Sequence, residues 1–313
     1  MENVVLRRSV IHSPPETSSN VGGARKLGMG MGRRLGYSVS FVAMVTVMAL
    51  ITQQLSSTIT ISTGAGTSLK QVARSKCPNV FAGGFKFNRI VYQRTVFEEL
   101  SDSTMIIIGA NIGDTTSDDS FPLLKGYKGV RKILVEPIPY LFEQLSSNVE
   151  KHGIQNATLV NAAIGESNGL ATMYCWDPNL MSTRAWPHWF SQVCSFSRSR
   201  LYNQSYDTAR FGALQEDIVE VSVERVTVRN LFETHAGSME DISVIQVDTE
   251  GFDYNVMIQL PFDDLSFRPC VITWEYVLLS NSQNSELVSW IIKFGYAFEL
   301  ELQNIVMYRV DGK

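Results

Sequence analysis

The 313-residue sequence contains few of the side chains that hold transition metals, with only four cysteines and four histidines. No two cysteines form a CxxC pair, and no cysteine and histidine stand at the spacing of a zinc ligand set. We therefore expect no metal site of this kind, although clustered carboxylates leave a requirement for Mg²⁺ open. We interpret the cysteines as free thiols. A disulfide between Cys175 and Cys194 would require an oxidising compartment.

Most of the chain also lacks an excess of positive charge. Residues 1–34 carry six basic and two acidic side chains, a net charge of +4, whereas the remainder carries 21 basic and 29 acidic side chains, a net charge of −8. Nucleic-acid binding needs a basic surface that matches the phosphates. The composition therefore argues against a nucleic-acid substrate.

Between Arg34 and Lys70 there is no charged residue at all. The first part of this stretch, residues 35–52, is mainly apolar, and as a helix it would span about 27 Å, close to the ~30 Å core of a bilayer. We predict a transmembrane helix at 35–55, after a basic cytosolic arm at 1–34. The Ser, Thr and Gly content of the following segment favours a stem and linker at 56–95.

The orientation of this helix follows from the basic residues that precede it. By the positive-inside rule the N-terminus stays in the cytosol and the C-terminal bulk is translocated, into the Golgi or a related lumen. Two alternatives remain open. A cleaved signal peptide would make the protein secreted, and a basic presequence would direct it to mitochondria.

From residue 96 to residue 313, strand-like and helix-like periodicities alternate. Short apolar runs at 105–108, 132–135 and 241–247 are typical of buried strands, and residues 139–152 show helical spacing. Further strands are expected at 157–163, 169–175, 219–226, 270–274 and as a closing pair around residues 303–304. Such alternation predicts an α/β domain with a parallel sheet and helices on both faces, in which ligands bind beyond the carboxyl ends of the strands.

The first of these strands runs into GANIGD at residues 109–114. Glycines let the backbone turn sharply and let a ligand approach closely. About 25 residues on, another strand ends in Glu136, where a carboxylate can accept both hydroxyls of an adenosine ribose. This pairing indicates an adenosine-type cofactor and fits NAD as well as S-adenosylmethionine.

Together with three later motifs, these residues resemble the FkbM-type methyltransferases. The family pattern is a GANxG turn, an EPxP strand end, an NxAxG, a DxEG and a final Glu after a strand. The matching segments here are GANIG at 109–113, EPIP at 136–139, NAAIG at 161–165, DTEGFD at 248–253 and WE at 274–275. They occur in the family's order, and the resemblance covers about residues 105–310.

The resemblance implies a Rossmann-like methyltransferase sheet with an antiparallel last strand and S-adenosylmethionine as cofactor. It also implies O-methylation of a sugar or other small hydroxyl compound. The cofactor-binding residues that it implies are Gly109, Ala110, Asn111, Gly113, Asp114, Glu136, Asn161 and Ala162.

Two positions depart from the family pattern. Ile107 replaces a carboxylate that the family often has two residues before the first motif glycine, and Gln246 replaces a lysine two residues before the DxEG aspartate. These departures support an alternative, a membrane-tethered binding protein with a decayed site. An NAD-dependent oxidoreductase is a further alternative, disfavoured because no Ser/Tyr/Lys set accompanies the glycines.

Three carboxylates are the candidate catalytic groups, Asp248, Glu250 and Glu275, which we expect to cluster where the sheet ends. A hydroxyl acceptor must lose its proton, and a positioned base adds about 10²–10⁴-fold to the rate. Alternatively, Asp248 and Glu250 cap the helix that begins near Phe252, and Glu275 is a solvent-exposed carboxylate.

An aromatic-rich insertion occupies residues 174–206 and contains three tryptophans and two phenylalanines. A long insertion of this kind inside a compact domain often forms a binding lid. An ordinary structural loop packed on the domain is the alternative.

Overall fold

The computed structural model describes residues 77–78, 88–100, 102–114, 121–204, 208 and 210–309. The predicted cytosolic arm and transmembrane helix, residues 1–55, lie outside the described residues, as does most of the predicted stem. Within the described ranges, none of the helices has the length and apolar character needed to cross a bilayer.

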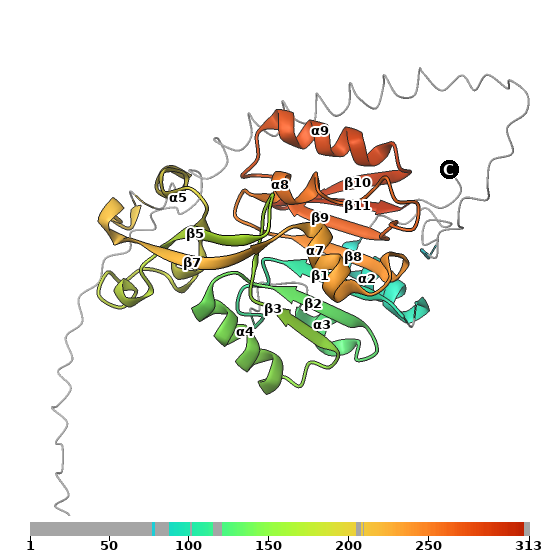
Figure 1. Cartoon of the computed structure of the whole chain (residues 1–313), viewed down its shortest axis with the longest axis horizontal. Coiled ribbons are helices and arrows are strands. Elements are labelled where there is room, and N and C mark those ends of the chain that lie inside the picture. Colours follow the sequence, from blue (N-terminus) through green and yellow to red (C-terminus); the bar gives the residue numbers. More distant parts are fainter. Residues whose placement is uncertain are drawn as a thin grey trace, which may run out of the picture. The chain divides into compact units, whose positions relative to one another are not determined.

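Seven strands of the described chain form one sheet in the order β10-β11-β9-β8-β1-β2-β3 (Figure 1). Their bounds are β1 Thr104–Ile108, β2 Arg131–Val135, β3 Ala157–Val160, β8 Ile242–Val247, β9 Val271–Glu275, β10 Tyr296–Glu301 and β11 Asn304–Arg309. The strand pairs β3–β2, β2–β1, β1–β8 and β8–β9 are parallel, whereas β11 is antiparallel to both β9 and β10. The predictions of an α/β fold and of an antiparallel last strand are therefore confirmed.

Both faces of this sheet are covered, which explains why its strands have continuous apolar runs. In β1, Met105 and Ile107 point to one face and Ile106 and Ile108 to the other, and all four are at most 2% exposed. The described helices are α2 Arg89–Glu99, α3 Phe121–Gly126, α4 Pro139–Lys151, α5 Arg198–Gln204, α7 Val228–Leu231, α8 Asp253–Met257 and α9 Asn281–Ile292.

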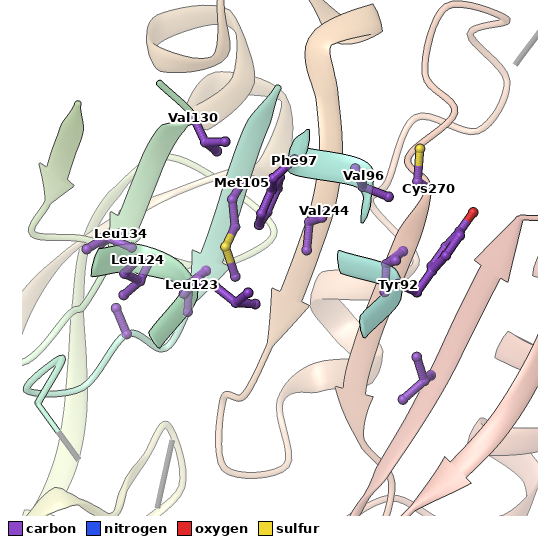
Figure 2. Close-up of a cluster of buried hydrophobic side chains, with 14 of the residues drawn as sticks. Tyr92, Val96, Phe97, Met105, Leu123, Leu124, Val130, Leu134, Val244 and Cys270 are labelled. Carbon is purple, nitrogen blue, oxygen red and sulfur yellow. The ribbon is translucent and has the colours of Figure 1, made fainter. Parts of the chain in front are cut away.

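Helices α2, α3 and α4 share one hydrophobic core with the Met105 face of the sheet. Figure 2 shows Phe97 of α2 beside Met105 of β1 and Val244 of β8, and Tyr92 and Val96 of α2 nearer to Cys270. The opposite face contacts α8 and α9. There, the indole N–H of Trp274 on β9 donates to Asn284 Oδ1 of α9 over 3.3 Å.

Two helix starts follow from local sequence signals. Pro139 stands in the first turn of α4, where its missing N–H costs nothing. At α9, Ser280 Oγ accepts from the Gln283 N–H and Gln283 Oε1 accepts from the Ser280 N–H, at 3.3 and 3.0 Å. This reciprocal capping box orders the first turn of α9.

A second sheet of four described strands was not predicted, and its order is β4-β7-β5-β6. Its strands are β4 Ala163–Ile164, β5 Gly169–Trp176, β6 Cys194–Ser195 and β7 Ile218–Val226. The expected single strand at 157–163 is wrong, because β3 and β4 belong to different sheets and residues 161–162 lie between them. The antiparallel β5–β7 pair extends away from the larger sheet (Figure 1).

The aromatic side chains of the insertion form a small core of their own. Trp176 and Phe190 stack with ring centroids 4.8 Å apart, and Trp186 lies 4.9 Å from Phe190. The 3₁₀ helices Pro178–Leu180 and His188–Gln192 and helix α5 surround these rings. The insertion is therefore a packed structural unit, and part of it also borders the cavity described below.

The interpretation of the four cysteines as free thiols is wrong. Cys77 is bonded to Cys270, 193 residues away, and Cys175 is bonded to Cys194. Cys175 and Cys194 are register partners on β5 and β6, which brings their Cα atoms within 4.3 Å. The Cys175–Cys194 disulfide, expected only in an oxidising compartment, is present in the structure. The Cys77–Cys270 disulfide was not predicted, because it depends on which distant segments become neighbours.

Candidate cofactor and acceptor site

A cavity of about 370 Å³ lies at the carboxyl ends of β1, β2 and β8. Residues 108–111 follow β1, residues 135–138 follow β2 and residues 248–250 follow β8, and each segment forms part of the wall. The insertion supplies residues 194–196 and the β10–β11 turn supplies residues 302–304. The cavity therefore stands where a parallel α/β sheet binds its ligand.

Gly109 makes the first turn possible. Its φ is +88°, and a Cβ at this position would overlap the carbonyl oxygen of Asp248. The Asp248 N–H donates to Ile108 O over 2.9 Å, which holds the two strand ends together. Only glycine permits this close approach of two backbones. Gly113 also has a positive φ, +59°, but a Cβ there would meet Leu145 of α4, so this glycine serves helix packing.

Glu136 is a buried carboxylate in the cavity wall, 4% exposed. Its Oε2 accepts from the Asn111 N–H and its Oε1 from the Ile138 N–H, both at 2.9 Å. Burial, opposed by these two hydrogen bonds and reinforced by Asp248, raises the pKa of Glu136 to about 7. A carboxylate offers about four lone-pair sites, so Glu136 retains acceptor capacity for a ligand.

Two asparagines hold the turns around Glu136. Asn161 Nδ2 donates to the carbonyl oxygens of Glu136 and Pro137 at 2.8 and 3.1 Å, from behind the wall. Asn111 has a φ of +49°, which asparagine tolerates better than most residues, and its Nδ2 donates to Gln192 Oε1 of the insertion at 3.1 Å.

Of the cofactor residues expected from the sequence, Gly109, Ala110, Asn111, Glu136 and Ala162 line the cavity. Three of the expected residues do not line it, namely Gly113, Asp114 and Asn161.

Asp114 instead interacts with the end of α4. Its Oδ1 lies 3.0 Å from His152 Nε2 and its Oδ2 lies 3.4 Å from Lys151 Nζ. A hydrogen bond from His152 is the main reason that the pKa of Asp114 lies below its usual range.

The structure brings the three candidate catalytic carboxylates together. Asp248 and Glu250 line the cavity, and Glu275 stands at the end of β9, beside β8. Burial and then Asp248 raise the pKa of Glu275 to about 8. Burial and the neighbouring carboxylates, Asp248 first, raise the pKa of Glu250 well above its usual value. Glu275 is half-buried, not solvent-exposed as the alternative interpretation has it.

Glu250 has a φ of +52°, a conformation that a non-glycine residue rarely adopts. Such strain persists only where the surroundings enforce it, and it is concentrated at functional sites. Here the enforcing contacts come from Asp253, a residue that sequence reasoning did not single out.

Asp253 is fully buried at the start of α8 and organises the whole DTEG loop. Its Oδ2 accepts from the Thr249 N–H, the Thr249 hydroxyl and the Gly251 N–H at 3.4, 3.0 and 3.2 Å. Its Oδ1 accepts from the Glu275 N–H at 3.2 Å. This carboxylate, and not Asp248 or Glu250, therefore ties the loop to the helix start and to β9. The aspartate that ends DTEGFD was the available signal.

A Rossmann-like sheet whose first turn and second strand end share one cavity is the architecture of proteins that bind adenosine-containing cofactors. Residues 108–298 match the methyltransferase FkbM domain. Because this match spans more than half of the chain, the protein belongs to the FkbM family of methyltransferases, as the sequence motifs predicted.

Two solved structures, both described as methyltransferases or methylases, are distantly similar to this chain. The precorrin-6y C5,15-methyltransferase from Geobacter metallireducens GS-15 has a TM-score of 0.34 and 12% identity, over 70% of this chain and 87% of that one. An rRNA methylase from Streptococcus thermophilus has a TM-score of 0.31 and 8% identity, over 72% of this chain and 100% of that one. Similarity this distant carries no argument about the site. No curated protein sequence matches significantly.

The two departures from the family pattern prove to be neighbours. Ile107 on β1 and Gln246 on β8 are register partners, so their side chains point to the same face of the sheet. That face is the one covered by α2, α3 and α4, and neither residue lines the cavity. Neither departure therefore places its residue in the described cavity wall.

Proposed function

We propose that the protein is an S-adenosylmethionine-dependent O-methyltransferase that acts on a hydroxyl group of a sugar or other small molecule. The observation that carries this proposal is the excess of carboxylates at one cavity. Glu136, Glu250 and Glu275 all have raised pKa values, and each is raised in part by Asp248. A bound cation would relieve this repulsion, and S-adenosylmethionine carries both a sulfonium and an ammonium group.

The residues present fit this cofactor. Gly109 lets the turn after β1 approach the Asp248 backbone, so that both segments reach the cavity wall. The Glu136 carboxylate in the same wall has lone pairs for the two ribose hydroxyls. Asn161 acts behind this wall as a positioning residue, because it holds the backbone around Glu136. Asn111 lies in the wall itself, and its N–H donates to the Glu136 carboxylate. When bound, S-adenosylmethionine supplies a methyl group on a positively charged sulfur, which a nucleophilic oxygen displaces.

The carboxylates after β8 and β9 supply the remaining chemistry. A hydroxyl acceptor loses its proton as its oxygen attacks, and a base works best when its pKa lies near the operating pH. With a pKa of about 8, Glu275 meets this condition, and the pKa of Glu250 is shifted in the same direction. Asp248 and Glu250 line the cavity, so one of them takes the proton or holds the acceptor oxygen in line.

The two disulfides support the proposal that the catalytic domain is lumenal, in the Golgi or a related compartment, behind a single N-terminal membrane helix. Disulfides persist in secretory compartments and are rare in the cytosol. In sealed microsomes the domain should resist added protease, and its digestion there would contradict this topology.

Calorimetric titration with S-adenosylmethionine tests the function. Glu136→Ala removes charge-assisted hydrogen bonds worth about 1.5–3 kcal/mol each, so affinity should fall at least about tenfold while the protein remains folded. Glu166→Ala, at an exposed carboxylate outside the cavity wall, is the matched control and should bind normally.

Three results would count against the proposal. Binding of NAD in place of S-adenosylmethionine would favour an oxidoreductase. Cofactor binding without transfer to any hydroxyl compound would favour a tethered binding protein. Unchanged affinity in a folded Glu136→Ala variant would remove the role assigned to this residue.

A further inference from the structure

The wall of the cavity also contains two arginines, Arg89 at the start of α2 and Arg200 on α5. The charge of Arg89 is balanced, because its Nε donates to Glu301 Oε2 over 3.0 Å in an ion pair. Arg200 donates from Nη2 to the carbonyl oxygen of Leu278 over 2.9 Å. Among the described residues it has no carboxylate within ion-pair distance.

Arg200 is therefore a half-buried cation that, toward the described part of the chain, has further N–H donors beyond the one bonded to Leu278. A guanidinium group has five N–H donors in a rigid fork that matches two oxygens of one oxyanion. A single bond to a neutral carbonyl uses one of these donors and leaves the charge uncompensated. Partial burial of such a charge costs free energy that an anionic ligand would offset.

The cavity wall combines groups of opposite charge. The segments that follow β2 and β8 contribute Glu136, Asp248 and Glu250, and α5 contributes Arg200, which we call the basic side of the cavity.

The basic side is held in place by the insertion. The Cys175–Cys194 disulfide joins β6 to β5, and Phe196 packs on Phe252 of the DTEG loop with ring centroids 4.9 Å apart. The bond from Arg200 to Leu278 ties α5 to the segment that follows β9. These contacts hold α5, and with it Arg200, in the wall of the cavity that Asp248 and Glu250 also line.

We propose that the methyl acceptor is an anion whose carboxylate, sulfate or phosphate group binds Arg200. This inference rests on the proposed O-methyltransferase function and specifies its substrate class as a hydroxylated acid, such as a sugar that contains a uronic acid. Arg200 is then the residue that selects acidic over neutral acceptors. The carboxylate of the cofactor is the competing source of the same chemistry, and the experiment must separate the two.

The test uses the full-length protein, S-adenosylmethionine labelled in its methyl group, and a polar extract of the cells that make the protein. The products are separated by anion exchange at pH 7 into retained and unretained fractions. Label should appear in the retained fraction, and Arg200→Gln should reduce it at least about tenfold because a charge-assisted ion pair is lost. Arg200→Lys should retain more label than Arg200→Gln but less than the parent protein, because lysine keeps the charge and lacks the fork. A second column at pH 2 separates carboxylates, which no longer bind, from sulfate and phosphate esters, which do.

Arg229→Gln is the matched control, because Arg229 is exposed on α7, outside the cavity. This variant should give the same amount of labelled product as the unaltered protein. Calorimetry on Arg200→Gln should give a cofactor affinity within about twofold of the parent protein. A fall of tenfold would assign Arg200 to the carboxylate of the cofactor and overturn the proposal. Label confined to the unretained fraction would overturn it as well. Failure to bind S-adenosylmethionine in the unaltered protein would instead refute the proposed function, and this inference with it.

Discussion

Replacing Asp253 with asparagine should destabilise the loop that carries the candidate catalytic carboxylates. Asparagine has the shape of aspartate but only one acceptor oxygen and an NH₂ group that donates. If its oxygen keeps the three bonds from Thr249 and Gly251, its NH₂ group faces the Glu275 N–H, donor against donor. One hydrogen bond is lost at a site that is fully buried.

The magnitude follows from these contacts. A buried donor left without a partner costs about 1–3 kcal/mol. The three retained bonds change from a charged to a neutral acceptor, which adds about 1 kcal/mol each at most. Against this, removing one buried charge relieves the desolvation that raises the pKa of Asp253. The net loss should be about 2 kcal/mol, which lowers the melting temperature by about 4–8 °C for a domain of this size.

The same substitution should change the pH dependence of methyl transfer. Asp253 contributes to the raised pKa of both Glu250 and Glu275, so its neutralisation lowers both values. The pH at which the rate rises should then move down. Thermal unfolding and a pH–rate profile measure the two effects, with Asp263→Asn, at an exposed carboxylate, as control. If melting temperature and pH profile both stay as in the parent protein, the organising role of Asp253 is refuted.

Three further outcomes are expected. If Asp248 is the base or positions the acceptor, Asp248→Asn should lower the rate of single-turnover methyl transfer by about 10²-fold or more, with little change in cofactor affinity. Activity within about threefold would show that Asp248 has neither role. The cofactor-free protein should lose stability toward urea as pH rises from 4.5 to about 8. In this window the Glu275 carboxyl stays protonated in the folded protein, whereas it is ionised in the unfolded chain. A stability that is flat or rises over this range would contradict the raised pKa of Glu275. Replacing Cys175 and Cys194 together by serine should cost about 3 kcal/mol of stability, measured by thermal unfolding. It should also weaken acceptor binding more than cofactor binding, measured by calorimetry. An equal loss of both affinities would mean that β6 does not position the acceptor side.

The sequence by itself determined the sheet and the strand ends from which the cavity is built. Apolar runs that end in a glycine turn or a carboxylate are local signals, and parallel strands bring their carboxyl ends to one edge whatever the loops do. Gly109, Glu136 and Asp248 could therefore be placed at one site before any contact was known. The five short motifs in order were enough to predict the family.

What only the tertiary structure decided depends on contacts between segments far apart in the chain. The Cys77–Cys270 disulfide and the second sheet depend on which distant segments become neighbours, and no spacing encodes this. Asp114 is the last residue of the GANIGD motif, but its side chain interacts with His152 at the end of α4. At this point the chain has already left the end of β1. Arg200 lies in an insertion without a motif, and it reaches the cavity because the insertion packs against the DTEG loop. Local periodicity places residues along a strand or helix, whereas the charges that meet across a cavity are set by packing.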